Sequence, residues 1–226
     1  MSLASYRKRV LSAGTNMAEI MSTDTKASQV AYILDSPARK DVFLNMDESV
    51  KVPTIPADVD TYKRRRFLFL PDSCVYIGDY ICHDGFTYIA VDMITHKEMP
   101  QLIGQLCNFD FPILIGVEEV EIDKKPNGEP IIAKKPKFIM KPSAITTKDY
   151  SVINNGKLNL PEGSMTAYLP YVEGEAIPII NQIIPRDTGE YKITDILTDG
   201  IVLFGDGKKR GYWEVRLQRV VNTYDQ

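Results

Sequence analysis

The fold of this chain is constrained most by residues 62–108. This stretch is a run of short apolar segments separated by turn-forming residue pairs. Asp84-Gly85 suits the two-residue turns whose twist matches a β-hairpin. After it, residues 86–91 alternate their side chains between the two faces of a strand. The fully apolar run 67–70 indicates a strand covered on both faces. The segment therefore predicts β-strands joined by tight turns.

The same pattern continues toward the C-terminus. Asn127-Gly128 predicts a second hairpin with a charged, exposed tip, and Asp199-Gly200 predicts a third between the runs on either side of it. Residues 213–218 alternate apolar and polar side chains, which predicts a strand of fixed register. The predicted fold is mainly β with an N-terminal α-helical arm. Its strands would form small β-barrel or sandwich-like units joined by tight hairpins.

The N-terminal part differs from the rest of the chain. Helical spacing of apolar residues predicts one helix before Gly14 and a second one that begins at Thr23 or Asp24. Ser36-Pro37 would end the second helix, because proline disfavours a helical residue before it. We expect three parts. A helical arm and linker cover residues 1–46, and a first β domain covers 47–117. A hairpin extension with a second β domain covers 118–226. Residues 47–60, with two prolines among charges, suggest a linker segment.

Composition limits the function classes. The formal net charge of −3 argues against a general basic surface for nucleic acid. No stretch approaches the roughly 18 apolar residues that a membrane-spanning helix needs, and no apolar region follows the N-terminal basic residues. We therefore expect a soluble protein that neither enters a membrane nor carries a secretory signal. Three cysteines, an odd number, suit free thiols in a reducing compartment.

Metal and catalytic chemistry find little support in the sequence. His83 and His96, with Cys82, Asp84 and Cys107, are the available soft ligands, but they lack the paired short spacing of zinc sites. Buried free thiols are the better interpretation. The sequence has no nucleophile-elbow or phosphate-loop motif, and the glycines near 205 favour a hairpin turn. We therefore predict no enzymatic activity, no catalytic residue, no metal and no cofactor.

Two basic clusters, Arg7-Lys8-Arg9 and residues 63–66, have two readings. They could contact phosphate or an acidic partner. Alternatively, they are solvated flanks that keep an apolar strand from pairing with another chain. The negative net charge favours the second reading.

Residues 62–108 resemble the head–tail connector proteins of tailed bacteriophages that infect Gram-positive hosts, also called head-closure or stopper proteins. The resemblance rests on short motifs that extend in weaker form to Tyr191-Lys192-Ile193-Thr194. It implies a ring that assembles under the portal at the capsid vertex, with genomic DNA passing through its centre. The family-like structural positions are Pro71, Asp72, Gly78, Asp79, Asp84, Gly85, Cys107 and Asn108.

The resemblance also implies partners and a location. The chain would bind copies of itself in a ring, the portal or an adaptor protein, and tail proteins, with double-stranded DNA passing without sequence specificity. It would be made in the bacterial cytoplasm and reside in the virion. The candidate subunit-interface arm comprises Tyr6, Arg9, Val10, Leu11, Val30 and Leu34. The candidate lumen-facing or neighbour-facing hairpin comprises Glu118, Glu119, Glu121, Asp123, Lys124, Lys125 and Glu129.

Two other function classes stay open at this point. A soluble adaptor could recognise a peptide or another protein through an uncovered β-strand edge, and it would be monomeric. A hydrolase with an unrecognised site would need a concave pocket with convergent polar groups and a perturbed pKa.

Overall fold

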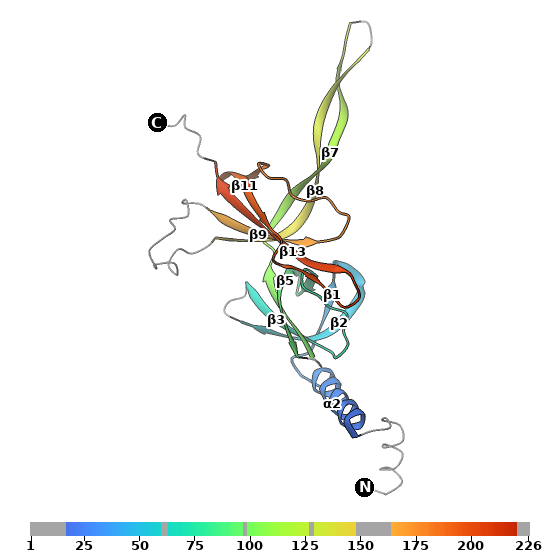
Figure 1. The fold of residues 1–226 in the computed structure, drawn as a ribbon. Coiled ribbons are helices and arrows are strands. Elements are labelled where there is room, and N and C mark those ends of the chain that lie inside the picture. Colours follow the sequence, from blue (N-terminus) through green and yellow to red (C-terminus); the bar gives the residue numbers. More distant parts are fainter. Residues whose placement is uncertain (1–16, 60–62, 97–98, 127–128, 148–163, 221–226) are drawn as a thin grey trace, which may run out of the picture.

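A computed structural model describes residues 17–59, 63–96, 99–126, 129–147 and 164–220 (Figure 1). The described part is mostly β: one helix precedes a closed barrel, and a second sheet follows it. The helix is α2 (Met17–Leu34). The barrel strands are β1 (Lys40–Leu44), β2 (Asp47–Asp58), β3 (Arg64–Phe69), β4 (Tyr80–His83), β5 (Phe86–His96) and β6 (Met99–Leu106). The second sheet contains β7 (Phe109–Lys124), β8 (Pro130–Thr147), β9 (Met165–Tyr171), β10 (Ile183–Arg186), β11 (Gly189–Leu197), β12 (Ile201–Leu203) and β13 (Lys209–Arg219).

The barrel confirms the predicted β-barrel character. Its strand order is β1-β2-β3-β6-β5-β4, and β1 closes it by pairing with β4. A Cβ atom on Gly104 would lie 2.9 Å from the Phe67 ring, so glycine lets that ring fill the centre. Burial of the apolar side chains removes them from water and holds the barrel together. The core comprises Val42, Leu44, Phe67, Phe69, Val75, Ile81, Tyr88, Ala90 and Leu102.

The second sheet has the order β10-β11-β13-β9-β8-β7, and β12 pairs with β13. Its edge strands are therefore β10, β7 and the short β12. β8 pairs with β9 only over residues 144–147, whereas it pairs with β7 along almost its whole length. The sheet core comprises Phe111, Ile113, Ile145, Ala167, Leu169, Ile184, Tyr191, Ile193, Val215 and Leu217.

Helix α2 lies beneath the barrel (Figure 1) and ends at Leu34, as Ser36-Pro37 predicts. It begins at Met17, before the expected Thr23 or Asp24. Its contact with the barrel includes Ile33, which is fully buried. An ion pair of 3.0 Å between Lys26 and Asp72 also joins the helix to the turn after β3.

The linker expected at 47–60 is wrong for most of that range, because residues 47–58 form strand β2. The two prolines fit there for a geometric reason. β2 pairs with β1 up to Thr54 and with β3 from Thr54 onward. Pro53 and Pro56 thus each lie where only one side of β2 is paired, and a missing N–H donor can face the free side.

The hairpin turn expected near Gly205 is confirmed, because it joins β12 to β13. The other three expected hairpins have different outcomes. Asp84 and Gly85 have positive φ values of 49° and 78° and join β4 to β5, which confirms that turn. Asn127-Gly128 lies outside the described residues, although the flanking strands β7 and β8 pair as expected. The hairpin at Asp199-Gly200 is wrong, because β12 pairs with β13 and not with β11. A Cβ on Gly200 would lie 2.6 Å from the Tyr212 ring, so this glycine serves close packing.

Candidate functional site

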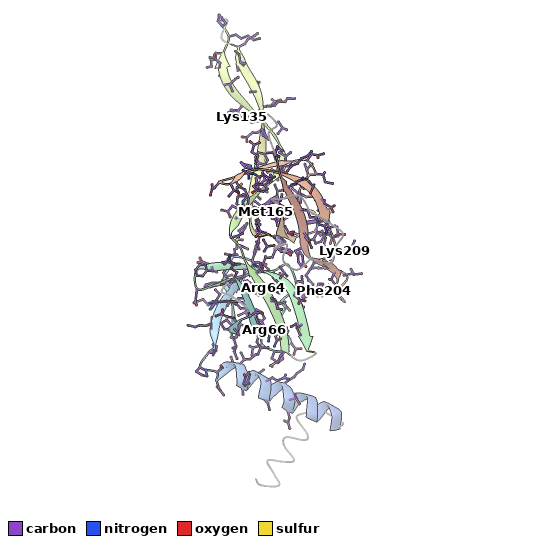
Figure 2. The ribbon with its side chains drawn as sticks, turned by 90° about the vertical axis from the view of Figure 1, so that its left-hand side faces the viewer. Arg64, Arg66, Lys135, Met165, Phe204 and Lys209 are labelled. Atoms are coloured by element: carbon purple, nitrogen blue, oxygen red, sulfur yellow. The ribbon has the colours of Figure 1, made fainter. Side chains whose placement is uncertain are left out.

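A long hairpin of β7 and β8 projects from the second sheet (Figure 1). Phe111 and Ile113 at its base are buried in the sheet core. From residue 115 outward, almost every side chain of β7 is exposed, and so are most of those on the returning β8. We call the projecting part, residues 114–126 and 129–140, the ribbon. Figure 2 shows Lys135 on the ribbon, beyond the sheet that carries Met165.

Two bulges bend the ribbon. The pairing register shifts between Leu114 and Gly116 and again between Glu121 and Asp123. Each shift leaves one extra residue on β7, Ile115 and Ile122, and both side chains are about half exposed. Bulges increase local twist, which agrees with the twisted course of the ribbon in Figure 1.

Charge is divided between the two strands of the ribbon. The predicted hairpin residues lie on β7 and around the tip and are exposed, as the hypothesis of a partner-facing hairpin requires. The sequence reasoning missed that β8 is basic. The cluster of lysines at 134, 135 and 137, beyond the predicted Asn127-Gly128 turn, could have revealed it. We call Glu118, Glu119, Glu121 and Asp123 the acidic row, and Lys134, Lys135 and Lys137 the basic row.

The basic row of β8 balances the acidic row of β7, so the hairpin lacks the net negative charge that motivated a lumen-lining role. Residues 109–147 carry six acidic and six basic side chains. The register places Glu118 opposite Lys135 and Glu119 opposite Lys134. The hairpin is therefore bipolar across its width, and it does not present a uniform acidic surface.

An apolar hollow of about 790 Å³ lies at the base of the ribbon. The barrel contributes Phe86, and the second sheet contributes Pro112, Phe138, Met140 and Ile183. Phe86 and Met140 are both more than half exposed. Exposed apolar side chains around a hollow offer a small surface that a partner could cover.

Two polar groups of this hollow, the Asn108 amide and the Cys107 thiol, are already hydrogen-bonded or poorly reactive. Asn108 Oδ1 accepts a hydrogen bond from the Ile145 amide at 2.8 Å, and its Nδ2 donates to the Ile145 carbonyl at 3.0 Å. Burial, with smaller effects from Cys82 and Asp110, raises the pKa of the Cys107 thiol to about 12. A protonated thiol is a poor nucleophile. The hollow therefore suits apolar binding better than covalent chemistry.

Cys107 and Asn108 also join the barrel to the second sheet. The Cys107 amide donates to the Thr87 carbonyl in the barrel, and the Asn108 amide donates to the Ser143 carbonyl in the sheet. At this unusual pair the chain passes from the barrel to the second sheet, and both backbone amides keep a hydrogen-bond acceptor.

A second contact between the units surrounds Asp79. The Asp79 carboxylate accepts hydrogen bonds from the Tyr76 amide at 2.8 Å and from Asn45 Nδ2 at 3.1 Å. Burial raises the pKa of Asp79, although these hydrogen bonds and Arg210 act in the opposite direction. The Arg210 guanidinium lies 3.7 Å from the centre of the Tyr76 ring. The remaining family-like positions lie in turns of the barrel part of the chain: Pro71, Asp72, Gly78, Asp84 and Gly85.

The candidate metal ligands are not brought together. Over the described ranges, no three His, Cys, Asp or Glu side chains cluster tightly enough to hold a metal ion. His83 is buried beside Phe67, and its Nε2 lies 3.2 Å from Asp84 Oδ2. Burial lowers the pKa of His83, while Asp84 raises it. The side chain of His96 lies outside the part of the structure that is described.

The candidate arm divides between described and undescribed residues. Tyr6, Arg9, Val10 and Leu11 lie outside the described residues. Val30 is half-buried and Leu34 is exposed, on the side of α2 that carries the exposed Ala27 and Ala31. Ile33, which the sequence reasoning did not single out, makes the buried contact to the barrel.

Comparisons with known proteins find no match. No family model, no curated protein and no solved structure matches this chain. Within the described ranges, no helix combines the length and the apolar character needed to cross a membrane.

Proposed function

We propose that this protein is a structural, non-catalytic subunit of a phage neck. Copies of the chain would form a ring between portal and tail that closes the capsid and forms part of the DNA channel. The motif resemblance of residues 62–108 motivates the proposal. The observation that carries it is the ribbon, which extends away from the barrel and the second sheet (Figure 1) and whose side chains are mostly exposed.

The ribbon supports a role in assembly for an energetic reason. A two-stranded hairpin is marginally stable by itself in water. This one extends from its sheet while exposing Val117, Phe138 and Ile139 to solvent. A partner surface would cover these side chains and stabilise the ribbon. The exposed face of α2 offers a second apolar surface, at Leu34, for the same purpose.

Electrostatics is compatible with DNA passage. A channel wall must avoid binding phosphates strongly, since each contact with Lys or Arg adds to affinity. The chain carries a net charge of −3, and the ribbon adds no net positive charge. Double-stranded DNA would therefore pass without being held strongly through its phosphates, and its passage would not depend on sequence.

Electron microscopy of the protein mixed with its portal tests the proposal. We expect rings seated on the portal vertex, and a bound ring in purified virions. Removal of residues 123–129 should reduce ring formation, whereas Leu203→Ser on β12, an exposed site away from the ribbon, should not. A monodisperse monomer that ignores the portal would contradict the proposal.

A protein-binding adaptor is the second candidate, and one observation favours it. β7 has 16 residues and pairs on one side only, so its outer edge could accept an added strand. This function predicts a monomer that binds an extended peptide, with amide protection appearing along β7 in hydrogen exchange.

A further inference from the structure

The ribbon has two open edges. β7 pairs with β8 alone, and β8 pairs with β7 alone until it reaches residue 144. Backbone C=O groups on the outer side of each strand, and N–H groups there except at the prolines of β8, therefore lack a strand partner among the described residues. Such edges are templates for pairing with another chain.

The charged rows on these edges are available to a partner. Although Glu118 faces Lys135 in the register and Glu119 faces Lys134, no ion pair within the described ranges joins any of these four side chains to another residue. The ion pairs found among the described residues of the ribbon lie near its tip, where Lys124 contacts Glu121 at 3.8 Å and Lys125 contacts Glu129 at 3.1 Å.

The sign of each row selects how two copies can meet. Two β7 edges side by side would bring acidic rows together, and two β8 edges would bring basic rows together. Like charges opposite each other destabilise a strand pair, and opposite charges stabilise it. Only a β7 edge against a β8 edge is favourable. That contact is heterologous, so it excludes a two-fold dimer and forms a ring when the rotation between copies closes.

We propose that the β7 edge of one copy pairs with the β8 edge of the next copy, so that the ribbons join into one closed cylinder of alternating acidic and basic strands. Ribbons related by a rotation axis point the same way. β7 runs toward the tip and β8 returns from it, so the neighbouring strands are antiparallel. This inference rests on the proposed ring and assigns its interface.

Edge protection is the competing explanation for charge on an exposed strand. Protection from self-association needs charges that repel every edge of an identical copy. Here each edge attracts the opposite edge of the next copy. The charge pattern therefore favours pairing between copies over protection.

Charge reversal tests the inference. One variant carries Glu118→Lys, Glu119→Lys and Glu121→Lys, and the other carries Lys134→Glu, Lys135→Glu and Lys137→Glu. We expect the assembled fraction of each variant alone, measured by mass photometry, to fall at least tenfold. A one-to-one mixture should regain assembly, because basic edges then meet acidic edges of the other variant. The chain with all six changes should also assemble, since its rows are again opposite.

Crosslinking of the unaltered protein gives a readout that does not depend on a variant's folding. Unlabelled and nitrogen-15-labelled chains are mixed and treated with a carbodiimide, which joins carboxylates to lysines in contact. We expect mass spectrometry to find peptides of the acidic row joined to peptides of the basic row between light and heavy chains. Circular dichroism of both variants checks that their folded content equals that of the unaltered protein.

The outcomes separate this inference from the proposed function. Rings that survive both charge reversals, or a mixture that does not regain assembly, would overturn the edge pairing and leave the neck ring standing. Absence of both light–heavy crosslinks and rings on the portal would overturn both.

Discussion

The Tyr80 hydroxyl in the barrel donates a 2.6 Å hydrogen bond to the Pro142 carbonyl at the base of β8. Burial is the main cause that raises the pKa of the Tyr80 phenol well above its ordinary value, so the donor stays protonated. Tyr80 also packs in a small apolar cluster with Ile89 and Ala144, which spans both units. Polar and apolar contacts therefore fix the second sheet on the barrel.

Tyr80→Phe should lower the free energy of unfolding by about 1–2 kcal/mol, because the Pro142 carbonyl loses its donor while the ring packing remains. Chemical denaturation measures the change. Tyr32→Phe on the exposed face of α2 is the control and should change stability by less than about 0.5 kcal/mol. Equal effects of the two changes would show that the bond across the units contributes nothing.

Gly78→Ala should destabilise the fold by about 3–5 kcal/mol. Gly78 has a φ of 90°, and a Cβ there would collide with the Gly211 backbone carbonyl, so strain and overlap add. Gly85→Ala is the matched control, since its φ of 78° is similar but a Cβ there meets nothing within 4 Å. The control should cost only about 1–2 kcal/mol. Thermal unfolding of both variants distinguishes the two contributions.

Ile33→Ala should lower the unfolding free energy by about 2–4 kcal/mol, because it leaves a cavity under the barrel. Leu34→Ala on the exposed side of α2 should cost less than about 1 kcal/mol in the isolated protein. If Leu34 belongs to the subunit interface, this control should still weaken ring formation. If Leu34→Ala lowered the unfolding free energy more than Ile33→Ala does, this result would contradict the observed packing of the helix on the barrel.

The raised pKa of Asp79 predicts a pH dependence of stability. The folded protein holds this proton more tightly than the unfolded chain does, so stability falls as pH rises from the ordinary value of 3.8 through the folded-state pKa. Asp79→Asn removes that fall, so its stability relative to the unaltered protein should increase over this window. Denaturant titrations at several acidic pH values measure the difference.

Asp206 provides a control of opposite sign. Hydrogen bonds from the Lys208 amide and the Arg210 side chain lower the pKa of Asp206. Its contribution to stability is present above pH 3.8 and is lost as pH falls through the folded-state pKa. Asp206→Asn should therefore lose stability relative to the unaltered protein as pH rises. If the relative stability of both variants changed in the same direction as pH rises, the opposite pKa shifts of Asp79 and Asp206 would be contradicted.

Alkylation should separate the cysteines. Cys74 is exposed and should react with iodoacetamide in the folded protein, whereas Cys107 should react only after unfolding, because its pKa of about 12 keeps it protonated near neutral pH. Mass spectrometry of peptides labelled before and after denaturation provides the measurement. Rapid labelling of Cys107 in the folded protein would show that the junction opens.

Local patterns predicted the features that depend on local physics. The alternation at 213–218 gave the right faces, with Val215 and Leu217 buried and Arg216 exposed, because one face of that strand meets the core. Asp84-Gly85 gave a hairpin because both residues tolerate positive φ.

Features that depend on distant partners could not be predicted in this way. Thr54 is buried because β2 changes partners there, and no neighbouring residue indicates this. Gly200 lies in a turn but makes no β-hairpin there, and its missing side chain leaves room for the Tyr212 ring. The basic row acquires its meaning only when the register sets Lys135 opposite Glu118.

Strand β7 continues from β6 through Cys107 and Asn108, whose amides are bonded to the barrel and to the sheet respectively. A pull on the ribbon is therefore carried along one covalent backbone into the barrel wall. Ladder hydrogen bonds in antiparallel sheets lie perpendicular to the strands. Tension along β7 must then shear many of them at once instead of opening them singly, which makes the projection mechanically stiff at its root.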